Sequence, residues 1–356
     1  MSLEYITTQF AIDGEFYGAE PWGNGHINDT YCATYRHGGT LSRYIHQRVN
    51  LNVFRRPVEM MDNIVRVTSH LRAKHNGNPS RHALTVIPAR DGRPYCVDPE
   101  GGFWRTFRCI ESARSYETVQ SPAQAYEAAR AFGEFQRQLA DLPPPRLHET
   151  IPDFHHTPKR FAALAGAIEA DVKNRAAHAR AEIEFAMRHE PLCHALINAG
   201  LPERVTHNDT KFNNVLLDDE TGEGVCVIDL DTVMPGLALY DFGDMVRSAT
   251  CKAAEDERDL RKVHMELEMF KALARGYWAS AGAMLTSSER ECLVVSGQLI
   301  TFEIGIRFLT DYLQGDVYFK VHRDGHNLDR CRTQFKLVES MTAQEPDMHR
   351  IVAQLD

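Results

Sequence analysis

The run HNDTKFNN at residues 207–214 brings together side chains that could handle a proton and a metal ion. Asp209 offers a carboxylate that can accept or orient a hydroxyl proton, and Asn214 offers an amide oxygen five residues later. A hard cation such as Mg²⁺ prefers oxygen ligands, and an amide provides one without adding charge. The spacing fits H-x-D-x-x-x-x-N, which is found in the catalytic loops of phosphoryl-transfer enzymes. An eight-residue pattern also arises by chance in loops, so this run alone leaves both interpretations open.

A further carboxylate follows at the end of an expected hairpin. Residues 215–217 and 225–228 are short apolar runs separated by the polar turn DDETGEG. A hairpin there returns the chain to the 207–214 loop and leaves Asp229 at the end of its second strand. We therefore predict that Asn214 and Asp229 are metal ligands and that Asp209 is the catalytic base. The alternative is an exposed acidic turn after a buried strand.

Lys211, two residues after Asp209, is a candidate catalytic cation. Its ammonium group could neutralise the charge that grows on a transferred phosphoryl group. The alternative is an ordinary lysine at the protein surface. We include Lys211 with Asp209 among the predicted catalytic residues.

A segment with two glycines, at residues 22–28, is a candidate phosphate-binding loop between two expected strands. Glycines let backbone N–H groups approach phosphate oxygens closely. A plain hairpin turn explains the same glycines almost as well. The predicted nucleotide contacts of this loop are Gly23, Gly25, His26 and Asn28.

These candidate groups need a scaffold, and the first 110 residues predict a small sheet with one helix. Alternating apolar and polar residues, bounded by turn residues, predict strands. Apolar residues at helical spacing predict one helix over 57–74. The expected strands are 15–22, 29–36, 41–49, 83–89 and 102–110.

The rest of the chain reads as mainly helical. Ser121-Pro122 opens a helix that should run to about Leu142, with Gln124 completing a capping box. Gly315 is the expected left-handed residue that ends another helix. The further expected helices are 157–200, 256–279, 287–314 and 333–344. The sequence therefore predicts an α+β protein with a nucleotide-binding lobe over 1–110 and a catalytic, substrate-binding lobe over 111–356.

Composition excludes several other classes of protein. The net charge of −9 argues against sequence-nonspecific binding of nucleic acid, which needs a surplus of Lys and Arg. No run of about 18 apolar residues suggests a membrane span, and the N-terminal residues show no signal peptide. The eight cysteines form no C-x-x-C pair, so we expect reduced thiols in a cytoplasmic protein.

Three runs together resemble the aminoglycoside phosphotransferase and choline kinase group, which is protein-kinase-like. They are HNDTKFNN at 207–214, VIDLDTVMPG at 227–236 and LYDFGD at 239–244. The resemblance implies a bilobal fold with a small antiparallel sheet in the first lobe, and it implies ATP and Mg²⁺ as cofactors. It places the metal carboxylate at Asp229 and gives Asp241 a structural role, opening a helix and bracing the catalytic loop. Asp231 stays open between a metal contact, a substrate contact and a solvated carboxylate.

One position departs from that group. Its third strand usually carries a lysine that meets the α- and β-phosphates, but this chain has Gln47 at that place in the run YIHQR. Arg48 should point to the opposite face of the sheet. Either Gln47 and other groups bind the nucleotide, or the chain is an inactive relative. The intact Asp209, Asn214 and Asp229 argue against inactivity. Adenine is expected near residues 107–111.

Longer runs indicate the substrate class. They resemble the branch of this group that phosphorylates the anomeric (C1) hydroxyl of N-acetylhexosamines such as GlcNAc and GalNAc. The resembling runs are GNGHINDTY at 23–31, FHHTPKRF at 154–161, RVTHNDTKFNNVLLD at 204–218 and IRFLTDYLQGDVYF at 306–319. The implied activity is that of an ATP-dependent sugar kinase with a small-molecule sugar as its partner.

The sugar pocket is expected near the last long helix. Carboxylates, Arg and hydroxyl groups suit sugar recognition, and we predict Arg307, Asp316 and Tyr318 as substrate contacts. Glu303 and Asp311 are interpreted as an exposed, salt-bridged helix edge.

Two other groups of functions remain open at the level of the sequence. The first is the same chemistry on an aminoglycoside, choline, homoserine or methylthioribose. A choline site would need an aromatic cage, and no tight aromatic cluster follows the catalytic loop in the sequence. The second is a non-catalytic nucleotide-binding module, suggested by Gln47.

Overall fold

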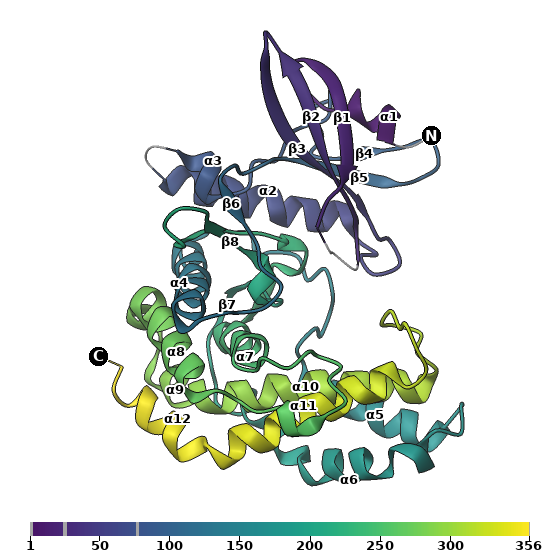
Figure 1. Ribbon diagram of the computed structural model, residues 1–356, viewed down its shortest axis with the longest axis vertical. Coiled ribbons are helices and arrows are strands. Elements are labelled where there is room, and N and C mark those ends of the chain that lie inside the picture. Colours follow the sequence, from purple (N-terminus) through teal and green to yellow (C-terminus); the bar gives the residue numbers. More distant parts are fainter. Residues whose placement is uncertain (1–2, 24–26, 76–77, 356) are drawn as a thin grey trace.

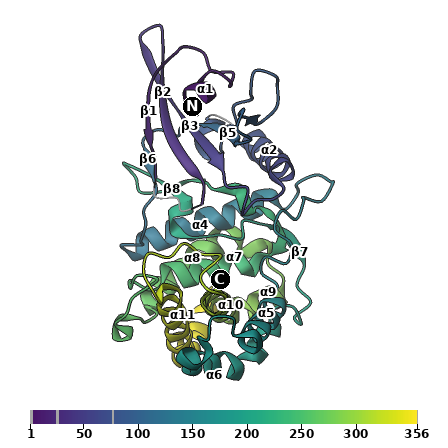
Figure 2. The ribbon, with the colours of Figure 1, turned by 90° about the vertical axis from the view of Figure 1, so that its right-hand side faces the viewer.

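A computed structural model describes residues 3–23, 27–75 and 78–355 of the chain. A twisted sheet forms the upper part, and a larger helical part lies below it (Figure 1). Helix α2 lies between the two (Figures 1 and 2). This bilobal α+β arrangement is the fold that the sequence predicted.

The upper sheet has five antiparallel strands in the order β1-β2-β3-β5-β4. The face of the sheet turned away from α2 covers a small apolar core built around Phe10, Tyr35 and Trp104, to which the short helix α1 contributes Ile6. The bounds are α1 Leu3–Thr7, β1 Glu15–Pro21, β2 Asp29–His37, β3 Thr40–Val49, β4 Cys96–Val97 and β5 Phe103–Arg108.

The predicted strand over 83–89 is wrong. This segment follows the short helix α3 (Pro79–His82) and forms only isolated bridges, Val86 with Phe107 and Ala89 with Phe10. Pro88 has no N–H to donate to a ladder, which limits regular pairing here. The fourth strand of the sheet is β4 instead.

Helix α2 spans Pro57–Lys74, the range that its apolar spacing predicted. Proline at its start fixes a helical φ and lacks only a hydrogen that the first turn would leave unpaired. Its buried face, with Met60, Ile64 and Val67, belongs to the same core cluster as the lower helices. The helix therefore joins the two lobes.

Two short sheets carry the chain into the lower lobe. After β5 ends at Arg108, β6 (Ala113–Arg114) pairs with β8 (Val215–Asp218), and β8 pairs with β9 (Gly224–Val227). Strand β7 (Glu203–Thr206) pairs with β10 (Met234–Leu237). The segment between β7 and β8, residues 207–214, thus connects two anchored strand pairs.

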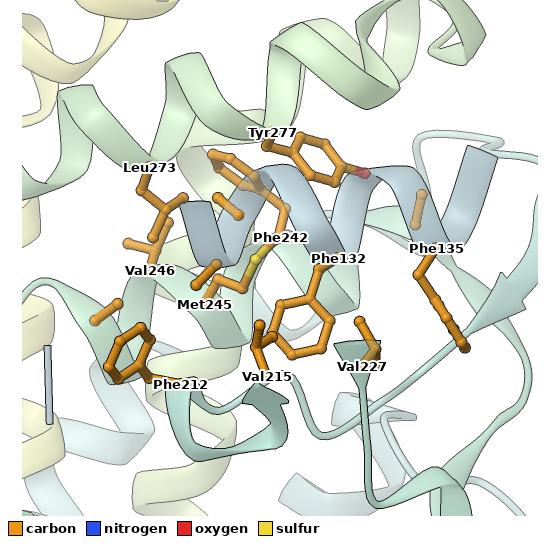
Figure 3. Close-up of a cluster of buried hydrophobic side chains, with 14 of the residues drawn as sticks. Phe132, Phe135, Phe212, Val215, Val227, Phe242, Met245, Val246, Leu273 and Tyr277 are labelled. Carbon is orange, nitrogen blue, oxygen red and sulfur yellow. The ribbon is translucent and has the colours of Figure 1, made fainter. Parts of the chain in front are cut away.

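The main core lies under that segment. Aromatic and aliphatic side chains from α4 and α8 pack against α7 and the β8–β9 pair (Figure 3). Gly276 of α8 allows close contact with α4, because a Cβ there would lie 2.1 Å from the Tyr126 carbonyl oxygen. The helices are α4 Pro122–Leu139, α7 Ala238–Ala249, α8 Leu267–Ala281 and α10 Leu293–Gln314.

Helix α10 is long and apolar enough to cross a membrane, with a mean hydropathy of 1.4 in its most apolar window. However, 78% of that window is buried inside the protein. Gly315 ends the helix with a φ of 101°, as the sequence predicted. The apolar composition of α10 is thus that of a central core helix.

A second core cluster joins the far half of α10 to the outer helices, where Phe302, Phe308 and Phe335 are buried. The single helix predicted over 157–200 is wrong, because the chain turns at Asp171, whose φ is +32°. The outer helices are α5 Thr157–Ala170, α6 Arg180–Arg188, α9 Ser287–Glu291, α11 His326–Ala343 and α12 Glu345–Val352. The 3-10 turns are 176–179, 190–194, 212–214, 230–232, 260–262 and 282–284.

Candidate active site

The catalytic loop runs from the end of β7 to the start of β8. Asn208 adopts a left-handed conformation with φ +65°, which an asparagine tolerates better than most residues. Its side-chain amide donates to the Thr232 carbonyl at 2.9 Å. The turn at 212–214 then leads into β8. The Asn208 side chain therefore ties the loop to the segment that leads into β10.

Asp209 and Lys211 form an ion pair, with Nζ 2.9 Å from Oδ1. Burial opposes ionisation of the Asp209 carboxyl, but the charge and hydrogen bond of Lys211, together with the charges of His207 and Arg247, lower its pKa. The Asp209 carboxylate in turn raises the pKa of the Lys211 ammonium. Asp209 is thus an ionised acceptor with a cation beside it.

Asn214 is tied to the same residue. Its Nδ2 donates to the Asp209 backbone oxygen at 2.8 Å and lies 3.3 Å from Asp209 Oδ2. Its backbone oxygen accepts from the Ile228 N–H at 2.9 Å. Because its Nδ2 is used in this way, the amide oxygen of Asn214 is the side-chain atom left to bind a cation.

Asp229 follows directly at the end of β9 and has a left-handed φ of +59°. Its side chain is accessible to solvent, yet surrounding protein atoms remove much of its hydration. That loss of hydration, with the charges of Asp231 and Asp209, raises its pKa to about 7. The structure thus brings Asp209, Asn214 and Asp229 together, as the sequence predicted.

This donor set suits a hard divalent cation. Among the described residues, no three His, Cys, Asp or Glu side chains gather as a metal-binding group. Two carboxylates and one amide remain, and these oxygen donors fit Mg²⁺, which keeps several waters and takes few protein ligands. A cation would also relieve the repulsion that raises the Asp229 pKa. Asn214 and Asp229 are the residues that would hold it.

Asp241 braces the catalytic loop from below. It is fully buried in the first turn of α7, and it accepts the backbone N–H of His207 at 2.9 Å and of Asn208 at 2.7 Å. Gln136 of α4 donates to it at 2.6 Å and accepts from the Tyr277 hydroxyl at 2.6 Å. The structural role predicted for Asp241 is confirmed, and the D-F-G run does not supply the metal residue.

A buried pair that the sequence misassigned braces the loop from the other side. Glu303 is fully buried and lies 2.8 Å from His155 Nδ1, while His155 Nε2 lies 3.0 Å from the Asn208 backbone oxygen. Both partners are acceptors, so both ring nitrogens donate and His155 is an imidazolium. Burial favours neutral groups, but the mutual attraction raises the pKa of His155 and lowers that of Glu303. The prediction of an exposed Glu303 is wrong.

The phosphate-loop candidates lie between β1 and β2. Gly23 has a φ of +72°, a conformation suited to glycine. Asn28 bridges outward: Nδ2 donates to Asp231 Oδ2 at 2.7 Å, and Oδ1 accepts from the Asn50 N–H at 3.0 Å. Gly25 and His26 lie outside the described residues. Their predicted nucleotide contacts, with those of Gly23 and Asn28, stay predictions.

Gln47 lies on β3 opposite Arg105 of β5 and accepts from its Nε at 3.0 Å. Arg105 in turn forms an ion pair with Asp231, and both side chains are almost completely buried. The interpretation of Asp231 as a solvated carboxylate is therefore wrong. Sequence reasoning missed Arg105. Its signal in the sequence was a charged residue between aromatic residues of the strand FWRTFR.

The predicted sugar contacts lie at the end of α10. The Arg307 guanidinium carbon lies 5.2 Å from the Phe154 ring centroid, 5.9 Å from that of Tyr318 and 5.7 Å from that of Phe319. Tyr318 is exposed. The Asp316 carboxylate is engaged by Arg175 at 2.6 Å and by Asn327 at 2.9 Å. Roles of these residues in sugar binding stay predictions.

Asp311, expected at an exposed helix edge, is buried instead. Its carboxylate accepts three successive backbone N–H groups, at residues 317, 318 and 319, over 2.8–3.0 Å. It thereby fixes the turn that carries Tyr318 beside Arg307. The helix-edge interpretation failed because the chain folds back over α10 after Gly315.

Solved structures share this fold. An aminoglycoside phosphotransferase from Alicyclobacillus acidocaldarius is 13% identical, covering 100% of this chain and 97% of that one, with a TM-score of 0.64. A microcompartment-associated aminopropanol kinase is 17% identical over 99% of both chains, with a TM-score of 0.59. Spectinomycin phosphotransferase, solved with ADP and spectinomycin, is 13% identical over 96% and 97%, with a TM-score of 0.56.

A family model adds sequence support to the shared fold. The model of the phosphotransferase enzyme family, APH, matches residues 18–278, from the first strand of the upper sheet to the end of α8. This range holds the catalytic loop, Asp229 and Asp241. The chain therefore belongs to the APH phosphotransferase enzyme family.

Proposed function

We propose that the chain is an ATP-dependent N-acetylhexosamine 1-kinase, which phosphorylates the anomeric hydroxyl of GlcNAc or GalNAc. The observation that carries the proposal is the convergence of Asp209, Asn214 and Asp229 on one side of a braced loop. Membership of a phosphotransferase family supports the reaction class. The substrate class rests on the long runs that resemble the N-acetylhexosamine branch.

In the proposed reaction, the sugar C1 oxygen forms a bond to the γ-phosphorus of ATP, and the bond to the bridging β–γ oxygen breaks. Asp209 aligns the hydroxyl and takes its proton, and ADP leaves. Lys211 lies where its charge can offset the charge of the transferred group. Bound Mg²⁺ would supply charge neutralisation on the phosphates. The protein contributes mainly positioning and electrostatic stabilisation.

A nucleotide cofactor is supported by a structural relative, since spectinomycin phosphotransferase was solved with ADP. In this chain we place the nucleotide between the loop that ends at Asn28 and the Asp229 strand end, with Gln47 on the adjoining strand. The adenine would lie near residues 107–111, where the chain passes from β5 to β6. Gly23, Gly25 and His26 would complete the loop over the phosphates.

The charge near α10 favours a neutral acceptor over a cationic one. Arg307 occupies the space among Phe154, Tyr318 and Phe319 that a quaternary ammonium group would need. Arg160 lies close enough for the Arg307 charge, after burial itself, to lower its pKa. Two guanidinium groups repel choline or an aminoglycoside. A sugar offers hydroxyl and acetamide oxygens that such donors bind.

The acceptor pocket would border the catalytic loop. Arg307 interacts electrostatically with His155 and Glu303, and His155 contacts the Asn208 backbone, one residue before Asp209. We therefore propose Arg307 and Tyr318 as sugar contacts. We propose that Asp316 also contacts the sugar, and that its bonds with Arg175 and Asn327 hold its carboxylate in position for this contact. A small-molecule sugar as partner and a cytoplasmic location complete the proposal.

An ADP-release assay with a panel of acceptors tests this function. The panel holds GlcNAc, GalNAc, glucose, choline, homoserine, methylthioribose and an aminoglycoside. We expect turnover with an N-acetylhexosamine, and phosphorus NMR should assign the product as the 1-phosphate. In Asp209→Asn, kcat should fall by about 10²–10⁴-fold, because an amide does not accept the proton.

Asp324→Asn is the matched control, because Asp324 is an exposed aspartate outside the catalytic loop. Its rate should stay within twofold of the wild type. Turnover only with choline or an aminoglycoside would overturn the proposed acceptor. Unchanged turnover in Asp209→Asn would overturn the proposed base.

A further inference from the structure

The cation that faces the metal residues from the upper sheet is Arg105 of β5. Its side chain is 1% exposed, although arginine is rarely so buried unless paired. Its guanidinium bonds to Gln47 through Nε, pairs with Asp231 through Nη1 and lies 5.3 Å from the Phe107 ring centroid. A buried arginine held on three sides is a positioned group.

The strand register places Arg105 beside the missing lysine position. Gln47 and Arg105 are direct partners in the antiparallel β3–β5 ladder. Directly opposed residues project from the same face, with Cβ atoms about 4.5–5.5 Å apart. A long side chain at 105 therefore reaches the space that a lysine at 47 would reach. The shorter, neutral Gln47 leaves room and accepts a hydrogen bond from Arg105.

We propose that Arg105 is the residue of the upper lobe that binds the nucleotide phosphates, in place of a lysine on β3. The cation that contacts the phosphates would then lie on β5, the strand paired with β3, instead of on β3 itself. This inference rests on the proposed function only in requiring that a nucleoside polyphosphate binds beside Asp229. It does not depend on which acceptor is phosphorylated.

The ion pair with Asp231 holds Arg105 near Asp229. Asp231 lies two residues after Asp229, and its second carboxylate oxygen accepts from Asn28 Nδ2 at 2.7 Å. Asn28 follows the glycine-containing loop. Arg105 and Asn28 are therefore both bonded to the Asp231 carboxylate, which connects the upper sheet to the strand end that carries Asp229.

The guanidinium of Arg105 has donors for an anion, although the carboxylates around it outnumber the cations, so a bound divalent cation would be needed to offset them. Asp209, Asp229 and Asp231 bring three carboxylates together, and Arg105 and Lys211 are cations whose fields reach Asp229. A guanidinium has five N–H donors, and its contacts with described residues use Nε and Nη1. Donors remain for phosphate oxygens, which a guanidinium binds in a bidentate manner.

Nucleotide affinity measured by calorimetry tests this inference without any acceptor. For Arg105→Gln, we expect ADP and ATP to bind about 10–100-fold more weakly, the loss typical of a hydrogen bond to a charged group. Adenosine, which has no phosphate, should bind within twofold of the wild type. Arg105→Lys should retain part of the ADP affinity.

Two double variants separate phosphate binding from a purely structural role. Arg105→Gln leaves Asp231 without its buried partner, so Arg105→Gln with Asp231→Asn removes that unpaired charge and should still bind ADP weakly. Arg105→Gln with Gln47→Lys returns the cation to β3 and should regain at least tenfold in ADP affinity. Thermal melting in the absence of nucleotide verifies that each variant is folded.

Arg36→Gln is the matched control, because Arg36 is an exposed arginine near the far end of β2. ADP affinity equal to the wild type in the Arg105→Gln, Asp231→Asn variant would overturn the inference and leave the proposed function standing. Arg105-dependent ADP binding without turnover on any sugar would overturn the proposed acceptor and support the inference. Loss of adenosine binding together with ADP binding would also contradict a phosphate contact.

Discussion

The catalytic loop and the β3–β5 strand pair solve the problem of placing polar groups in different ways. The loop keeps its groups within eight residues of the chain and holds them from two sides by buried charges, Asp241 and the His155–Glu303 pair. The strand pair brings Gln47 and Arg105 together across 58 residues of sequence by register alone.

This difference has a physical reason. In a loop at a strand end, each side chain's place in space depends on its position in the chain. Residues that are to meet one metal and one hydroxyl must therefore keep their spacing. In a ladder, opposed residues share one face, so a long side chain on either strand reaches the same space. Functional groups on a sheet can therefore exchange between strands, while those of the loop keep their spacing.

The largest effect on stability is expected at the buried His155–Glu303 pair. Replacing His155 with Gln leaves a buried carboxylate without its countercharge, so the free energy of unfolding should fall by about 3 kcal/mol. Because the pKa of His155 is raised on folding, its contribution to the free energy of unfolding is complete below pH 6.5. That contribution is lost as the pH rises above the pKa of His155 in the folded state. Because the pKa of Glu303 is lowered on folding, its contribution to the free energy of unfolding is complete above pH 4.5 and is lost at lower pH. The difference in stability between the wild type and His155→Gln should therefore be largest between pH 4.5 and pH 6.5.

Urea unfolding followed by circular dichroism across this pH range measures that difference. His148→Gln is the matched control, because His148 pairs with Asp62 at the exposed surface and should matter little. A loss of stability that is constant with pH would show that the pair is not ionised, and the loop would then be held by packing alone.

Asp241→Asn should have the next largest effect. The amide keeps one acceptor oxygen, so its NH2 group must face one of the two backbone donors, the N–H of His207 or the N–H of Asn208. We expect a loss of about 2 kcal/mol in the free energy of unfolding, since a buried donor loses its acceptor. Because the loop shifts, kcat should fall more than the KM for ATP rises.

Thermal unfolding and steady-state kinetics on the same preparation test Asp241→Asn. Asp13→Asn, at an exposed position before β1, is the control and should behave as the wild type. A variant that melts earlier but keeps its kcat would show that the loop geometry survives without this brace.

The smallest effect is expected at Gln47, because the strand pair places the charge elsewhere. Gln47→Ala removes the hydrogen bonds to Arg105 and Thr30, so ADP should bind only about 3–10-fold more weakly. Calorimetric ADP titration measures this, with Gln354→Ala as an exposed control. A loss larger than that of Arg105→Gln would reverse the assignment and make Gln47 the main phosphate contact.

Sequence reasoning was accurate where a residue's role depends on its near neighbours. Helix α2 was predicted to the residue, and Ser121 caps α4 by accepting the Gln124 N–H at 3.3 Å. The hairpin that ends at Asp229 was also predicted, because turn chemistry and alternating burial are local. Gln124 departs slightly from the expected capping box, since its side chain accepts from the Gln120 N–H.

Sequence reasoning failed where burial depends on distant segments. Glu303 and Asp311 look like a polar stripe at helical spacing, but segments before α5 and after α10 cover them. The strand expected over 83–89 had the right alternation without a regular ladder partner. In each case the local pattern was real, and a remote segment decided the outcome.

By itself, the sequence identified Asp209, Asn214 and Asp229 as one candidate group, because these three oxygen donors sit at the ends of short local elements. Only the tertiary structure decided that Asp231 pairs with Arg105 and that the buried cation of the upper lobe therefore lies on β5. Arg105 reaches that position through strand register, and pairing between strands is set by the whole sheet and the core beneath it.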